Sequence, residues 1–102
     1  MADFSIVFPA YNEATVIIDT VRSYVDYFGD RAELIIIDNG SEDGTQKLIE
    51  QNFRDDARVK YFYFDHPLGK GGAVYEGFKH ASSDLLGFTD TDESVPADQF
   101  DR

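Results

Sequence analysis

A pair of aspartates separated by one residue, Asp90 and Asp92, is the strongest candidate metal site in the sequence. The pair follows a short apolar run, residues 85–89, which is typical of a strand. Side chains two residues apart on extended backbone point the same way, so both carboxylates can face one cation. An all-oxygen site suits Mg2+ or Mn2+, which complete their coordination with water and substrate phosphates. Because acidic turns are common in so acidic a chain, the position of the pair in the fold must decide between a metal site and a solvated turn.

A glycine-rich block, Gly69-Lys70-Gly71-Gly72, is a second candidate site. It lacks the spacing of a P-loop, and no Ser or Thr follows its lysine. One interpretation is a flexible turn that caps a helix. The other is a phosphate contact, in which the Lys70 ammonium or backbone amides near Gly71 approach a diphosphate at the helix N-terminus.

Asp38 ends the most hydrophobic run of the chain, residues 34–37. A carboxylate at this place could accept hydrogen bonds from a nucleobase or a ribose. It could equally cap the turn predicted over residues 39–41, as Asp side chains do without any ligand. The residue types alone leave both interpretations open.

Other kinds of site are disfavoured. Residues 9–13, Pro-Ala-Tyr-Asn-Glu, stand where a dinucleotide-binding fold needs Gly-x-Gly-x-x-Gly, which argues against a nicotinamide enzyme. His66 and His80 have no partner at ligand spacing, so we expect them at the surface. No serine or cysteine nucleophile motif is present.

Alternating strand and helix patterns position these candidates. Apolar and aromatic runs predict four strands, at residues 4–8, 34–37, 59–64 and 85–89, and helical spacing of apolar residues lies between them, at 16–28, 48–53 and 73–81. This alternation predicts an α/β fold: a three-layer, doubly wound, Rossmann-like parallel sheet, with strand order 3-2-1-4. Such sheets bind ligands at the carboxyl ends of their strands, where all the candidate residues lie.

Length, composition and net charge predict the number of domains and exclude some classes of protein and partner. With 102 residues and 42% hydrophobic content, the chain is long and apolar enough for one folded domain. It has no cysteine, no apolar run that could span a bilayer and no signal peptide, so we expect a soluble, cytoplasmic protein. Its net charge of -11 disfavours nucleic acid as a partner, and an anionic ligand would need a bridging metal.

Taken together, the motifs resemble those of the family 2 glycosyltransferases, which have the GT-A fold. The resemblance spans residues 4–94 and rests on four segments in order, each after its own predicted strand: residues 4–13, 37–45, 69–73 and 90–92. The lysine-glycine block with Tyr75-Glu76-Gly77 is similar to the branch that makes dolichyl- or undecaprenyl-phosphate sugars.

The resemblance implies roles for individual residues in binding a UDP- or GDP-linked sugar. Pro9, Tyr11 and Glu13 would frame the nucleotide, and Asp38 would hydrogen-bond its base. Asp90 and Asp92 would hold Mn2+ or Mg2+ against the diphosphate, with Lys70 and Gly71 as further nucleotide-binding candidates. Asn39 stands where many family members have a second Asp.

The resemblance also implies what these residues do not include. An inverting transfer uses a carboxylate base and acceptor-binding loops that lie beyond Arg102 in the family's pattern, so the catalytic base is unknown here. We therefore expect residues 1–102 to be a single nucleotide-sugar-binding domain, inactive by itself, whose uncovered sheet edge favours a homo-oligomer. The acceptor would be a lipid phosphate, with the full-length protein at the cytoplasmic membrane face.

Two alternatives belong to other functional classes. Asp65 and Thr89 mimic the phosphoacceptor and switch positions of a metal-dependent signalling receiver domain. The sequence, however, lacks the acidic pair that a receiver domain needs directly after its first strand. The other alternative is a noncatalytic nucleotide-binding module, which measurements of nucleotide binding and transfer would distinguish.

Overall fold

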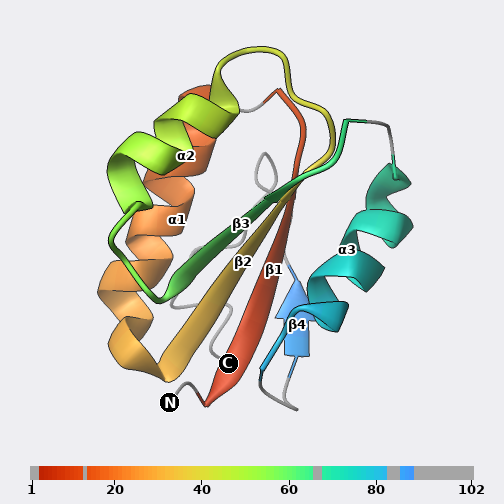
Figure 1. Cartoon of the computed structure of the whole chain (residues 1–102). Coiled ribbons are helices and arrows are strands. Elements are labelled where there is room, and N and C mark those ends of the chain that lie inside the picture. The colour runs from red at the N-terminus through yellow and green to blue at the C-terminus, as the bar shows by residue number, and fades with distance from the viewer. Residues whose placement is uncertain (1–2, 13, 66–67, 83–85, 89–102) are drawn as a thin grey trace.

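A four-stranded parallel sheet forms the centre of the protein. The computed structural model describes residues 3–12, 14–65, 68–82 and 86–88. The strands are β1 (Phe4–Ala10), β2 (Ala32–Asp38), β3 (Val59–Tyr63) and β4 (Leu86–Phe88). Their order is β3-β2-β1-β4 and every pairing is parallel, as Figure 1 shows. The predicted parallel sheet and its strand order are confirmed.

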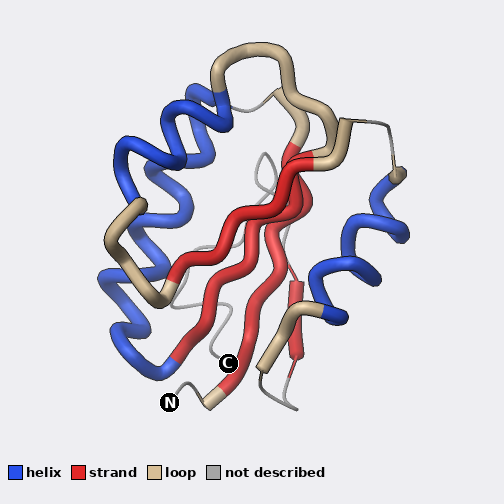
Figure 2. Tube along the Cα trace, in the orientation of Figure 1, coloured by secondary structure: helices blue, strands red, loops and turns tan. Residues whose placement is uncertain are grey.

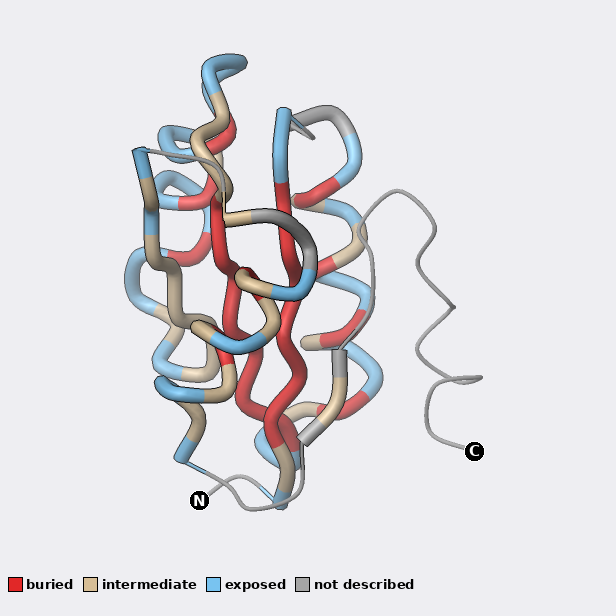
Figure 3. Tube along the Cα trace, turned by 90° about the vertical axis from the view of Figure 1, so that its right-hand side faces the viewer, coloured by how far each residue is buried: buried red, intermediate tan, exposed pale blue. Residues whose placement is uncertain are grey.

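Helices cover both faces of the sheet. Helices α1 (Ala14–Phe28) and α2 (Thr45–Phe53) lie on one face, and α3 (Gly69–Lys79) lies on the other (Figures 1 and 3). A 3-10 turn, η1 (Gly29–Arg31), connects α1 to β2. This arrangement confirms the predicted three-layer α/β architecture. Within the described part of the chain, no helix has the length and apolar character needed to span a bilayer.

The two central strands, β1 and β2, contribute side chains to both hydrophobic clusters of the core. Their alternate side chains enter different apolar clusters, as expected for a sheet that is covered on both faces. Phe8 and Ile36 pack under α1 and α2, whereas Val7 and Ile35 pack under α3. The ring of Phe8 meets that of Tyr24 on α1 edge-to-face, with centroids 5.1 Å apart. The sheet is therefore a rigid base for the loops that leave its strands.

The first strand runs through Pro9, although the sequence predicts a strand over residues 4–8 only. Strand β1 continues to Ala10, whose carbonyl accepts a hydrogen bond from the Asn39 amide at 2.8 Å. Successive residues of a strand direct their backbone polar groups to opposite sides, so the Pro9 nitrogen faces away from β2. The β1–β2 pairing therefore loses no hydrogen bond to the missing N–H.

Helix α3 begins earlier than predicted, because the glycine-rich block forms its first turn rather than a turn before it. Amides in a first helical turn need no acceptor within the helix, so residues with weak helix propensity are tolerated there. Packing further along α3 also favours the helix. Gly77 lies so close to β1 that an added Cβ would stand 2.4 Å from a Val7 methyl carbon.

A buried carboxylate, that of Glu33, connects three segments near the amino ends of the strands. It accepts hydrogen bonds from the Ser5 hydroxyl of β1 at 2.7 Å and from the Ser82 amide and hydroxyl at 2.9 Å each. The Lys60 ammonium of β3 lies 2.5 Å from the same carboxylate. Glu33 thus fastens both neighbouring strands and the segment after α3 to β2.

Candidate functional site

The loops that follow β1, β2 and β3 meet at the carboxyl edge of the sheet, drawn in tan at the top of Figure 2. Backbone hydrogen bonds join them in sequence. The Asn39 amide donates to the Ala10 carbonyl at 2.8 Å, and the Phe64 amide donates to the Asp38 carbonyl at 2.9 Å. The candidate residues after these strands therefore belong to one cluster of loops, at the edge where such sheets bind ligands.

Asp38 lies at the centre of this cluster and is fully buried. Its Oδ1 accepts a hydrogen bond from the Ser41 amide at 2.8 Å, which confirms the predicted turn-capping role. Its Oδ2 accepts a hydrogen bond from the Tyr61 hydroxyl of β3. The protein thus holds the carboxylate in one orientation from two sides. The contact with a nucleobase stays a prediction.

Tyr61 is a site residue that the sequence reasoning missed. Burial, together with the hydrogen bond to Asp38, raises the pKa of Tyr61 well above its ordinary value. The phenol therefore keeps its proton and acts as a donor to Asp38 at any physiological pH. The only signal in the sequence was a tyrosine within a predicted strand, and the register that sets Tyr61 opposite Ile36 is a tertiary property.

Asn12 joins the loop after β1 to the loop after β2. Its backbone amide donates to Ser41 Oγ at 2.8 Å, and its side-chain Oδ1 accepts from the Glu42 amide at 2.7 Å. Its φ of 50° lies in the left-handed region, which Asn tolerates better than most residues. Sequence reasoning placed Asn12 in a candidate segment but assigned it no role.

Asn39 makes a similar connection to the third loop. Its Oδ1 accepts a hydrogen bond from the Leu68 amide at 2.6 Å, directly before α3 begins. Gly40, the next residue of this loop, has φ 86°, and a Cβ added to it would lie 3.4 Å from the Phe64 carbonyl oxygen. The amino end of α3 is thereby tied to the loop that carries Asp38.

The predicted nucleotide-binding residues are distributed around this edge. Pro9 is buried near the end of β1, whereas the Tyr11 side chain is 56% exposed. Lys70 and Gly71 lie in the first turn of α3. Glu13, Asp90 and Asp92 lie outside the described residues, as do His66 and Thr89. The convergence of the whole set is therefore still a prediction.

The candidate metal pair follows β4 in the sequence. Strand β4 runs parallel to β1, with Phe88 opposite Val7, so the carboxyl ends of both strands face the same edge. Among the residues that the structure describes, no group of three or more His, Asp or Glu side chains could hold a metal ion. His80 instead stacks on Phe62 with ring centroids 3.9 Å apart.

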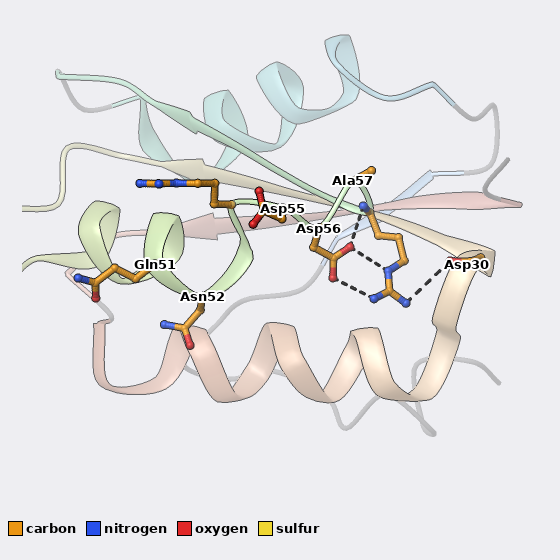
Figure 4. A pocket seen from close by; sticks show the side chains of 8 residues that line it. Asp30, Gln51, Asn52, Asp55, Asp56 and Ala57 are labelled. Carbon is orange, nitrogen blue, oxygen red and sulfur yellow. Dashed lines mark hydrogen bonds and ion pairs between the residues drawn. The ribbon is translucent and has the colours of Figure 1, made fainter.

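A pocket of about 650 Å³ lies at the opposite edge of the sheet, near the amino end of β3. Figure 4 shows Asp30, Asn52 and Asp56 around it. The Arg58 guanidinium donates two hydrogen bonds to the Asp56 carboxylate, each 2.9 Å long, and these bonds lower the pKa of Asp56. Because Arg58 already pairs with Asp56 and none of the predicted site residues lines it, this pocket is not the candidate site.

Comparisons with known proteins identify what the chain resembles. The family model described as "Glycosyl transferase family 2" matches residues 5–102. The chain is 36% identical over 95 residues to glycosyltransferase AglD of Haloferax volcanii, covering 88% of this chain and 15% of that protein. It is 32% identical over 97 residues to dolichyl-phosphate beta-glucosyltransferase of Saccharomyces cerevisiae, covering 86% and 29%. The chain thus spans well under half the length of these curated relatives.

Solved structures share the fold. The mannosyltransferase PcManGT from Pyrobaculum calidifontis, in complex with GDP-Man and Mn2+, superposes with a TM-score of 0.81 at 24% identity, over 96% of this chain and 30% of that one. Glucosyl-3-phosphoglycerate synthase from Mycobacterium tuberculosis, with Mn2+, UDP and glucosyl-3-phosphoglycerate, gives 0.68 at 26% identity, over 88% and 33%. These likenesses confirm the fold class expected from the sequence.

Proposed function

The chain belongs to glycosyl transferase family 2, and we propose that it binds the nucleoside diphosphate end of a sugar donor at the carboxyl edge of its sheet. The observation that carries the proposal is the cluster of three loops around Asp38. In open parallel sheets, ligands bind outside the carboxyl ends of the strands where the strand order reverses. Here the order reverses between β1, which neighbours β2, and β4.

The nucleoside would contact the loops after β1 and β2. Tyr11 offers an exposed aromatic ring against which a base can pack. We assign Pro9 and Glu13 to contacts with the same nucleoside. A carboxylate has about four lone-pair positions, and protein donors bond once to each oxygen of Asp38. The remaining positions can accept from a base N–H or a ribose hydroxyl, once the ligand displaces the groups that cover Asp38.

The diphosphate would lie between α3 and the residues that follow β4. The first turn of α3, with Lys70 and Gly71, presents backbone amides and the positive end of the helix dipole. Asp90 and Asp92 would hold Mn2+ or Mg2+, a donor set of carboxylate oxygens that suits either ion. When bound, the ion neutralises charge on the departing diphosphate. Two of the related proteins were crystallised with Mn2+, which supports this assignment.

For the whole protein we propose an inverting sugar transfer. An acceptor oxygen attacks the anomeric carbon, the bond from that carbon to the diphosphate breaks, and a general base takes the acceptor proton. The relatives are several times longer than this chain, and we assign the base and the acceptor-binding loops to that additional length. The names of two relatives, from Saccharomyces cerevisiae and Campylobacter jejuni, support an acceptor that is a polyprenyl phosphate or a saccharide linked to a polyprenyl diphosphate.

Thermal unfolding with and without metal tests the donor site. UDP or GDP at about 100 times its dissociation constant should stabilise the fold by about 2.7 kcal/mol in the presence of Mn2+. Chelation by EDTA should abolish most of this gain, because the chain carries a net charge of -11 and repels the diphosphate. Asp92→Asn should behave like EDTA, whereas Asp19→Asn, exposed on α1, should not.

Two results of this unfolding experiment would contradict the proposed site or the proposed function. Equal shifts in melting temperature with Mn2+ and with EDTA would show that Asp90 and Asp92 form only a solvated turn. The absence of any shift with either nucleotide would refute the proposed function. Family membership argues against the receiver-like alternative, and a transfer assay on the longer protein distinguishes an enzyme from a noncatalytic nucleotide-binding module.

A further inference from the structure

Asn12, in the loop after β1, hydrogen-bonds to the loop after β2 both as a donor and as an acceptor. Its amide donates to the Ser41 hydroxyl, and its side chain accepts from the Glu42 amide, at 2.8 and 2.7 Å. One bond is donated and the other is accepted, and they meet adjacent residues of the partner loop. Such a pair restrains the two loops in both distance and rotation.

This pair of bonds connects two residues of the proposed donor site. Tyr11 precedes Asn12 directly, so the bonds that hold the Asn12 backbone also restrain the backbone that carries the Tyr11 ring. Ser41, which accepts from the Asn12 amide, donates its own amide to Asp38 Oδ1 at 2.8 Å. One peptide link and two hydrogen bonds therefore separate the exposed ring from the buried carboxylate.

The backbone of Asn12 explains why this residue type suits the position. Its φ of 50° is unfavourable for most side chains and acceptable for Asn, Asp and Gly. Of these three, only Asn and Asp also supply an oxygen that can accept from Glu42. Asn12 is exposed, so its geometry is maintained by these bonds rather than by packing.

We propose that Asn12 is a positioning residue for the donor nucleotide, which holds Tyr11 and Asp38 in a fixed relation so that both can contact one nucleoside. The proposal rests on the proposed function above. A site whose loops are ordered beforehand loses less conformational freedom on binding and binds more tightly. Loss of the Asn12 acceptor should therefore weaken nucleotide binding without removing any group that touches the nucleotide.

Two substitutions separate the acceptor from the backbone conformation. Asn12→Gly keeps the left-handed conformation and removes the oxygen, whereas Asn12→Asp keeps both. The dissociation constants of UDP and GDP with Mn2+ would be measured by calorimetry at physiological salt. Amide exchange at Glu42 would report the hydrogen bond itself without ligand, and urea unfolding would establish that all variants are folded at the assay temperature.

Asn12→Gly should bind nucleotide about five- to tenfold more weakly, the range that one hydrogen bond represents, with faster exchange at the Glu42 amide. Asn12→Asp should stay within about threefold of the wild type. Unchanged affinity in Asn12→Gly, with faster Glu42 exchange, would overturn this proposal alone. Equal losses in both variants would overturn it too, because the acceptor would then be irrelevant. A wild-type chain that binds neither nucleotide would refute the proposed function, and this inference with it.

Discussion

Replacement of Glu33 by Gln should destabilise the fold by an amount that depends strongly on pH. Burial alone would raise the pKa of the Glu33 carboxyl, but hydrogen bonds from Lys60, Ser82 and Ser5 together lower it from 4.5 to about 2. Because the pKa is lower in the folded chain than in the unfolded one, the carboxylate contributes stability above pH 4.5. That contribution is lost as the pH falls from 4.5 towards 2.

The magnitude follows from the same two values. Each unit of pKa corresponds to about 1.4 kcal/mol, so the lowering of the Glu33 pKa represents on the order of 3 kcal/mol at pH 7. The Glu33 side chain is only 8% exposed, so solvent screens these contacts little. Glutamine resembles the protonated acid in shape and charge. The difference in unfolding free energy between wild type and Glu33→Gln should therefore shrink to about 1 kcal/mol near pH 2.5.

Urea unfolding followed by circular dichroism at both pH values measures this difference. Glu76→Gln is the matched control, because Glu76 pairs with Lys79 at 3.2 Å on the outside of α3. Exposed pairs of this kind contribute less than about 1 kcal/mol, and the control should change little at either pH. A Glu33→Gln effect of the same size at pH 7 and pH 2.5 would refute the reasoning, since the loss would then come from packing rather than from charge.

Four further expectations follow from the structure. Gly77→Ala should destabilise the fold by about 1–2 kcal/mol in urea unfolding, because the added Cβ would overlap Val7. Gly71→Ala in the same helix has open space around it and should be neutral or slightly stabilising. Equal effects of the two substitutions would contradict the close contact at Gly77. Tyr61→Phe should lower stability by about 1–3 kcal/mol, because Asp38 loses a donor in a buried place, and an unchanged urea midpoint would disprove that hydrogen bond. The 102-residue chain, incubated with labelled donor, polyprenyl phosphate and Mn2+, should form no glycolipid, because transfer requires an acceptor held in line with the anomeric carbon. Metal-dependent formation of glycolipid would refute this expectation. Light scattering should detect self-association at high concentration through β3, the outer strand next to β2 in the described sheet, whereas a clean monomer would count against it.

Much of the architecture was predictable because it depends on local pattern. The apolar run at residues 34–37 lies within β2, and the run at 59–64 covers β3 and one residue after it. The alternation of such runs with helices led to the correct strand order. The turn after Asp38 was also predictable, since its hydrogen bond spans three residues. The errors concern ends of elements, at Pro9 and at the start of α3, where pairing and packing outweighed propensity. The metal-binding role of Asp90 and Asp92 is still a prediction.

Residue type and spacing along the chain indicate where each strand ends, so they also predict which residues leave the strands at one edge. The contacts that those residues make depend on how the chain folds. The partners of Asp38, Asn12 and Glu33 include Tyr61, Ser41 and Ser82, which lie 23, 29 and 49 residues away from them along the chain. Contacts over such separations depend on strand register and on the path of the crossovers, and a one-residue change in register would move every side chain to the other face.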